Sequence, residues 1–261
     1  MRVFSWVMLV AIAAVLGCGC TFFQVQRDVH NEDNPYCRDV VVKRIAIAPF
    51  VFGEKTENQR YDFDLKGTDL PDGRFVVFSA EIAREFGQEL AQFRGFEVVP
   101  PADVMQAWQA GGDDLNPLAS AESARALARN LKADAIIVGE VRSYDPYDYP
   151  RLELAWQVLY ATRHSPSAEE IRRIERHGTG RPFPLGADYS KYPLYAADEV
   201  IDSRDVKVNA SLEDYASSLK TRGSGYENGA VAIRKRAWPD YFRFASWYAL
   251  RGAFDFERAR R

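Results

Sequence analysis

Apolar residues between positions 40 and 160 recur in two rhythms, one typical of strands and one typical of helices. Val40–Phe52 and Ala133–Val141 are nearly continuous apolar runs rich in β-branched residues, which predicts two buried strands. Leu152–Tyr160 alternates between apolar and polar residues. This alternation predicts a half-exposed strand that pairs with the preceding one across the turn at residues 144–150. A further short strand is expected at Phe96–Val99.

Helical spacing marks the segments between these strands. Phe78–Phe93 carries apolar residues every three or four positions, with Ser79 as the expected N-cap and Gly95 as the expected stop. Pro101–Gln109 and Ser120–Leu131 are also predicted helices. Strands that alternate with helices in this way predict an α/β fold, a mixed β-sheet flanked by helices, for residues 40–160.

The other segments are less regular. Glu54–Arg74 is charged and contains two glycines and a proline, so we expect a long loop. Residues 161–261 are expected to form an insertion and a C-terminal helical extension that packs on the core, with Glu199–Asp205 as a candidate strand returning to the sheet. Helices are predicted near Ala168–His177, at Ser211–Leu219 and at Asp240–Arg258.

The last of these helices carries an apolar stripe. We expect the stripe to pack on the sheet; the alternative is a contact with a partner or a membrane. Its members are Phe244, Trp247, Tyr248, Leu250, Phe254 and Phe256.

The N-terminus has the pattern of an export signal. One basic residue, Arg2, precedes the uncharged run Val3–Leu16, which is shorter than the roughly 20 apolar residues that span a bilayer. The junction Val15-Leu16-Gly17-Cys18 resembles the bacterial lipobox. The resemblance implies cleavage before Cys18 and attachment of lipid to its sulfur. An uncleaved N-terminal anchor helix is the alternative.

Residues 18–39 are polar and are expected to tether the lipid to the folded domain. They contain Cys20 and Cys37, a candidate disulfide, because an exported chain meets oxidising conditions. Two free thiols, or a lipid site at Cys20 in place of Cys18, are the alternatives. The residue after Cys18 is glycine and not aspartate, which by resemblance to enterobacterial lipoproteins favours the outer membrane over the inner one.

Composition narrows the class of protein. The 261 residues are 47% hydrophobic and 27% charged, which is typical of a globular protein and excludes a disordered chain, a collagen-like repeat or a multi-span membrane protein. The formal net charge is −3, so no basic excess favours nucleic acid as a partner.

Three sequence blocks, in order, resemble a known group of proteins. These are KRIAIAPF at 43–50, GFEVVP at 95–100 and ARALARNLKADAIIVGEV at 124–141. Together they resemble the curli-secretion lipoprotein family, the lipoprotein activators of penicillin-binding proteins and the N-terminal domain of TolB. The resemblance implies a mixed sheet flanked by helices and a role in the cell envelope. It covers about residues 40–160 and lacks the family's later D-x-x-T/S-G hairpin.

Candidate chemistry is sparse. Glu140, Asp145 and Asp148 could supply an acid–base pair, although the two aspartates also suit a turn. His164 and His177 lie 13 residues apart, without the three- or four-residue spacing of helix-borne metal ligands. No nucleophile motif occurs in the sequence. We therefore expect no catalytic residue, no metal and no cofactor.

The turn after the second long strand is rich in tyrosine. Tyr144, Tyr147 and Tyr149 alternate with Pro146 and Pro150. Rigid aromatic side chains of this kind suit contact with a partner. The alternative is that the rings cap the end of the sheet.

These observations predict four segments: a signal peptide (1–17), a lipidated tether (18–39), an α/β core (40–160) and the C-terminal extension (161–261). The function expected is that of a lipid-anchored, periplasm-facing module that binds or assembles envelope proteins or peptidoglycan-associated complexes and is not an enzyme. A subunit of an outer-membrane export pore is the first alternative. It is disfavoured because only Arg151–Tyr160 alternates over a membrane-strand length. A carboxylate-dependent envelope hydrolase is the second.

Overall fold

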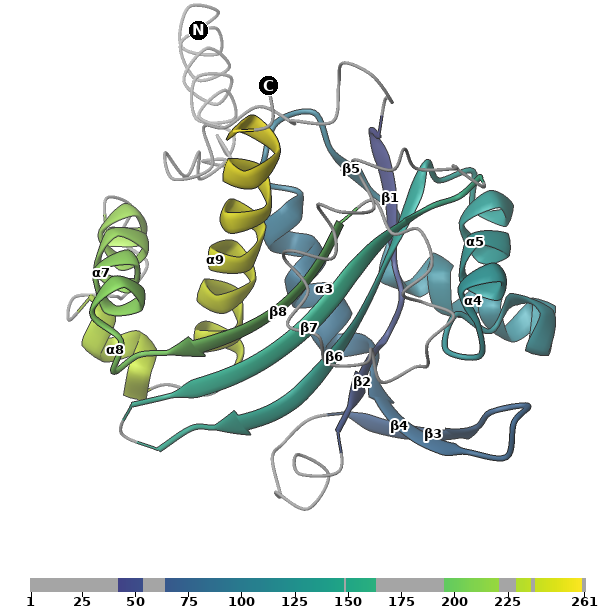
Figure 1. Cartoon of the computed structure of the whole chain (residues 1–261), viewed down its shortest axis with the longest axis horizontal. Coiled ribbons are helices and arrows are strands. Elements are labelled where there is room, and N and C mark those ends of the chain that lie inside the picture. Colours follow the sequence, from purple (N-terminus) through teal and green to yellow (C-terminus); the bar gives the residue numbers. More distant parts are fainter. Residues whose placement is uncertain are drawn as a thin grey trace, which may run out of the picture.

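A central strand with a break in it organises the sheet (Figure 1). The computed structural model describes residues 42–53, 64–147, 149–162, 195–220, 229–235 and 238–259. The run predicted as one strand forms β1 (Arg44–Ile47) and β2 (Phe50–Phe52), and both pair in parallel with β6 (Ala135–Asp145). The break falls at Ala48 and Pro49, where the proline has no amide hydrogen for the ladder.

The two halves of this strand have different outer neighbours. β5 (Glu97–Val98) pairs in parallel with β1, and β4 (Phe75–Ser79) pairs antiparallel with β2. On the other side, β6 continues through a hairpin into β7 (Arg151–Tyr160), which pairs with β8 (Tyr195–Asp202). The described strands thus form one mixed, eight-stranded sheet, which confirms the predicted α/β class. The candidate returning strand is real but starts earlier, at Tyr195.

The segment predicted as a long loop contains a strand. Leu65–Asp69 forms β3, which pairs antiparallel with β4, while residues 54–63 lie outside the described part. The ring of Phe75 covers Gly67 so closely that a Cβ atom there would lie 2.2 Å from the ring. An aromatic ring packed across a strand glycine stabilises the pair, and the charged sequence of β3 gave no sign of it.

Helices cover both faces of the sheet (Figure 1). On one face, α4 (Pro101–Gly111) and α5 (Ala121–Asn130), joined through the 3₁₀ helix η3 (Gly112–Leu115), pack into one apolar cluster. The other face carries a larger cluster. Its helices are α3 (Ala80–Leu90), α7 (Val206–Lys220), α8 (Ala230–Lys235) and α9 (Trp238–Ala259).

The N-cap predicted for helix α3 is confirmed, but the bounds of the helix differ from the prediction. Ser79 caps α3 as predicted, and its Oγ accepts hydrogen bonds from the amides of Glu81 and Ile82. The helix itself begins at Ala80, since Phe78 and Ser79 still belong to β4, and it ends at Leu90, well before Gly95. The helix predicted near 168–177 lies outside the described residues.

Four of the six residues in the apolar stripe of α9 lie in the core, as expected, while Tyr248 is half-buried and the side chain of Phe256 lies outside the described part. Phe244, Trp247, Leu250 and Phe254 are at most 2% exposed, and the Phe254 ring meets Phe93 edge to face at 4.8 Å. No helix among the described residues is both long enough and apolar enough to span a membrane. Residues 1–41, with Cys18, Cys20 and Cys37, lie outside that part, so the anchor and the disulfide stay predictions.

Candidate functional site

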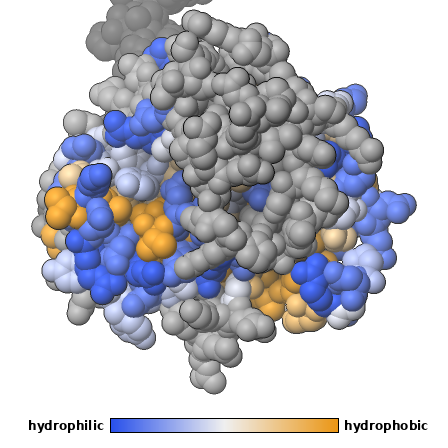
Figure 2. All heavy atoms as spheres, viewed as in Figure 1, coloured by the Kyte–Doolittle hydropathy of each residue, from blue (hydrophilic) through white to orange (hydrophobic). Residues whose placement is uncertain are grey.

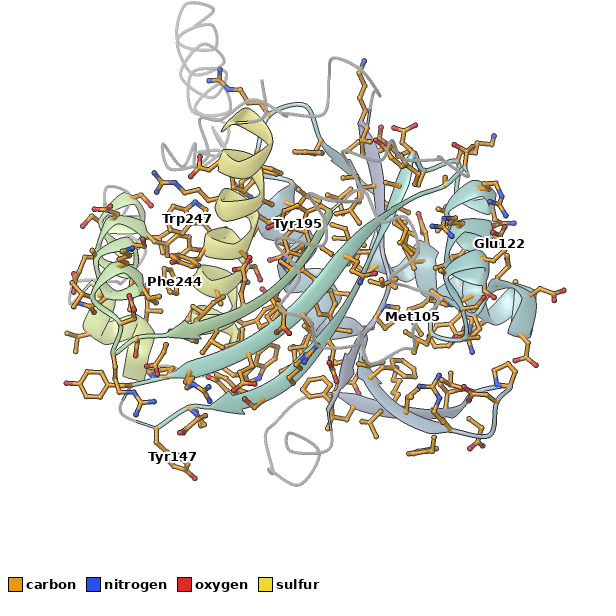
Figure 3. All side chains as sticks on the ribbon, viewed as in Figure 1. Met105, Glu122, Tyr147, Tyr195, Phe244 and Trp247 are labelled. Atoms are coloured by element: carbon orange, nitrogen blue, oxygen red, sulfur yellow. The ribbon has the colours of Figure 1, made fainter. Side chains whose placement is uncertain are left out.

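The tyrosine-rich turn lies at the tip of the β6–β7 hairpin, and its tyrosines divide between surface and core. Tyr147 is 79% exposed and Tyr149 is 51% exposed. Figure 3 shows Tyr147 pointing away from the molecule. Tyr144 is 4% exposed and stacks on Tyr241 of α9 with ring centroids 6.5 Å apart. The expectation that Tyr144 contacts a partner is therefore wrong for this structure, because β6 extends to Asp145 and turns this ring into the core.

Hydrogen bonds hold the turn. The Asp145 carboxylate accepts from the amide of Tyr147 at 3.1 Å, an Asx turn. The carbonyl oxygen of Pro150 accepts from the amide of Ser203 at 3.0 Å, which joins this turn to the one between β8 and α7. Asp148 is outside the described residues. The two exposed rings thus belong to a turn that is held by hydrogen bonds.

The neighbouring turn adds charge and apolar area. Arg204 donates from Nε and an Nη atom to the two oxygens of Asp202, at 3.0 and 2.8 Å. Hydrogen bonds from Arg204, with further help from Arg151, hold the pKa of Asp202 below its usual value. Val206, which begins α7, is 82% exposed.

We call the exposed residues of these two turns the hairpin-end patch: Tyr147, Tyr149, Arg204 and Val206. Six large apolar side chains of the described part stay substantially exposed, and three of them belong to this patch. The other three are Phe75, Val200 and Val231. Figure 2 shows apolar and polar side chains interspersed over α7, the helix that begins at Val206 of the patch. A cluster of exposed apolar side chains, like the three in this patch, is typical of a contact surface.

Glu140 lies in the interior of the sheet and belongs to a buried ion-pair cluster. Arg142, at a bulge in β6, contacts Glu140 and Asp198, each with a shortest nitrogen–oxygen distance of 3.3 Å. Burial raises the pKa of Glu140 to about 7, against the attraction of Arg142, and Asp198 raises it further. One guanidinium thus contacts two carboxyls.

Glu140 and Asp145, two of the three carboxyls considered for an acid–base pair, do not lie together. Asp145 is five residues further along β6, roughly 16 Å away at the rise of a strand, and it is exposed. The carboxyl that does approach Glu140 belongs to Asp198, on β8. No sequence signal linked these two residues, because 58 positions separate them and β7 lies between their strands.

A cavity of about 650 Å³ opens between β8, α7 and α9. It is lined by Tyr195, Glu199, Val200, Ser211, Asp214, Tyr248, Arg251, Gly252 and Asp255. None of these residues was singled out from the sequence for a site. Within the part of the chain that the structure describes, no group of three or more His, Cys, Asp or Glu could hold a metal ion. His164 and His177 lie outside that part.

No family model matches this chain, and no curated protein matches it. Among solved structures, the C-terminal domain of LpoB from Salmonella enterica aligns with 62% of this chain and 85% of that one, at 12% identity and a TM-score of 0.34. A hypothetical protein from Chlamydia trachomatis aligns with 82% of this chain and 97% of that one, at 12% identity and the same TM-score. Likenesses this distant carry no argument about function. The family resemblance of residues 40–160 therefore stays a prediction.

Proposed function

We propose that this chain is a lipid-anchored protein of the bacterial envelope that faces the periplasm and binds or assembles envelope partners without catalysing a reaction. The lipobox-like junction at Cys18 supports the anchor, and the glycine that follows it favours the outer membrane. The observation that carries the binding role is the exposure of Tyr147 and Tyr149 on a hydrogen-bonded turn.

Physical chemistry favours binding at the hairpin-end patch. Tyrosine offers a large contact area with few rotatable bonds, so little conformational entropy is lost on binding. Hydrogen bonds at Tyr147 and Pro150 lower that cost further, because they already hold the backbone at these two positions. Arg204 beside the rings can pair with a carboxylate or a phosphate at the rim of an interface. We infer a partner that is an envelope protein or a peptidoglycan-associated complex.

The alternatives have less support. Arg142 forms ion pairs with both Glu140 and Asp198, and the three side chains are at most 16% exposed, which suits a structural cluster better than a hydrolase centre. For a pore subunit, the alternating strand β7 would have to enter a membrane. It is instead paired with β6 on one side and β8 on the other.

Site-specific photocrosslinking in cells tests the proposal. A benzophenone amino acid would replace Tyr147 in one strain and Tyr149 in another, with Phe75 as the matched control. Phe75 is an aromatic residue of similar exposure, 62%, on the distant β3–β4 hairpin. We expect a discrete adduct with an envelope protein from positions 147 and 149 and none from 75. Equal adducts from all three positions, or none from the turn, would contradict binding at this patch.

A further inference from the structure

The cavity between β8, α7 and α9 has the size of a ligand site. Its volume of about 650 Å³ lies within the range of small-molecule pockets. β8 supplies Tyr195, Glu199 and Val200, and the remaining lining comes from the two helices. No residue of the hairpin-end patch lines it, so it is a separate site on the molecule.

The charges of the lining favour a cation. Glu199, Asp214 and Asp255 supply three carboxyls, while Arg251 is the one basic residue among the described residues of the lining. The guanidinium of Arg251 lies over the ring of Trp247, 5.3 Å from its centroid, in a cation–π contact. Figure 3 shows Trp247 between α9 and α7. With their carboxyls ionised, these described lining residues carry a net charge of −2.

Glu199 lacks a compensating cation. Among the described residues, no Lys or Arg nitrogen lies within ion-pair distance of its carboxylate, in contrast to Glu140 with Arg142. Burial raises the pKa of Glu199 to about 7, and Asp198 raises it further, while the indole N–H of Trp156 acts in the opposite direction. That N–H is buried and does not reach hydrogen-bond geometry with any partner. A partly buried carboxylate beside an open cavity is stabilised by a ligand that brings a positive charge.

Two tyrosines give the cavity an aromatic wall. Tyr195 is 8% exposed, and its ring packs on Trp156 with centroids 4.9 Å apart. Tyr248 lines the cavity from α9, and its pKa is raised first by burial and then by the negative charge of Glu199. Aromatic rings beside a carboxylate suit a ligand with an apolar stem and a cationic head.

We propose that this cavity binds an alkylammonium group, with the ammonium at Glu199 and the aliphatic stem against Tyr195 and Tyr248. The chemistry is shared by free diamines or polyamines and by the lysine side chain of another protein. The inference stands independently of partner binding at the hairpin-end patch.

Calorimetric titration of the full-length chain in detergent tests the site with four probes. Pentylamine is compared with 1-pentanol, which has the same stem and no charge, and we expect the alcohol to bind at least about tenfold more weakly, a difference of about 1.4 kcal/mol. Cadaverine and Nα-acetyl-lysine amide separate the two sources of the ammonium group. Tighter binding of cadaverine identifies a free amine, and tighter binding of the lysine derivative identifies a side chain. Absence of amine binding, or equal binding of pentylamine and pentanol, overturns the proposal.

Three variants locate the binding. Glu199→Gln should weaken pentylamine binding about tenfold or more, because it removes the charge and keeps the shape. Gly252→Leu keeps every charge and fills the cavity, since a Cβ atom built at Gly252 meets nothing within 4 Å. Glu213→Gln, on the same helix as Asp214 but outside the lining, is the matched control and should bind as the unmodified chain does. Unchanged affinity in both Glu199→Gln and Gly252→Leu, with folding verified by circular dichroism, would contradict the site.

Discussion

Tyr215 on α7 donates its hydroxyl hydrogen to Oε1 of Glu89 on α3 across 3.1 Å, and both side chains are 1% exposed. The bond joins residues 126 positions apart and fixes the C-terminal helices to the first helix of the core. Because the acceptor is a buried carboxyl, its solvation depends on this donor.

Replacing Tyr215 with phenylalanine should therefore destabilise the fold. The change removes one hydrogen bond to a charged group, and we expect the free energy of unfolding to fall by about 1.5–3 kcal/mol. Urea unfolding followed by circular dichroism measures it. Tyr147→Phe is the control, since that hydroxyl is at the exposed tip of the hairpin, and it should change stability by less than about 0.5 kcal/mol. Equal stability of the two variants would rule out this role for Tyr215.

The double change Tyr147→Ala/Tyr149→Ala should separate binding from folding. Both rings are exposed, so the free energy of unfolding should change little. Binding of the envelope partner should weaken by about 1 kcal/mol or more for each of the two rings that is buried in the interface. A phenotype assay beside Glu140→Gln compares the binding and hydrolase hypotheses. A null phenotype for Glu140→Gln together with normal behaviour of the tyrosine variant would favour the hydrolase.

The raised pKa of Glu140 makes stability depend on pH. Its pKa is about 7 in the folded chain against 4.5 ordinarily, so the folded state binds more protons than the unfolded state between these values. The contribution of Glu140 to the free energy of unfolding is fully present below pH 4.5 and is lost as the pH rises through 7. Urea unfolding at pH 5 and pH 8 should show lower stability at pH 8, and Glu140 alone should contribute on the order of 3 kcal/mol to the difference. Glu140→Gln should flatten this dependence in part, with Glu199 causing the remainder. A slope that is the same in both chains would disprove the shift at Glu140.

Cleavage before Cys18 and acylation of its sulfur follow from the Val15–Cys18 junction. Two or more acyl chains hold a protein firmly, because each buried methylene contributes about 0.8 kcal/mol. Intact-mass analysis of the membrane-extracted protein should give a mature chain that starts at a lipidated Cys18. An unmodified Cys18, or a mature chain with another first residue, would exclude the lipoprotein hypothesis.

Cys20 and Cys37 are expected to form a disulfide once Cys18 is alkylated. A loop of this size contributes about 3 kcal/mol in the chain-entropy picture when its ends are ordered, and less in a flexible tether. Peptide mapping without reductant should recover the linked pair. Recovery of both thiols in the free form would eliminate the bridge.

Most elements of the fold were predictable from local pattern. Spacing alone identified the apolar run of β6, the alternating strand β7, the Ser79 cap and the stripe of α9. The prediction that β7 is half-exposed was wrong, because nearly all of its residues are buried. Local pattern works here because burial of one face, and satisfaction of the first amides of a helix, depend on residues a few positions apart. Strand β3 was not predicted, because the contact that stabilises it is made by the Phe75 ring on the partner strand.

The sites depended on contacts between distant parts of the chain. By itself, the sequence indicated the export signal, the α/β class and the tyrosine-rich turn. Only the tertiary structure decided that Tyr144 is buried against Tyr241 while Tyr147 is exposed, that Asp198 lies beside Arg142, and that β8 and α9 enclose a cavity. Sequence spacing records which residues share one face of an element. It does not record which face of another element they will meet, because that depends on how strands and helices far apart in the chain pack around a common core.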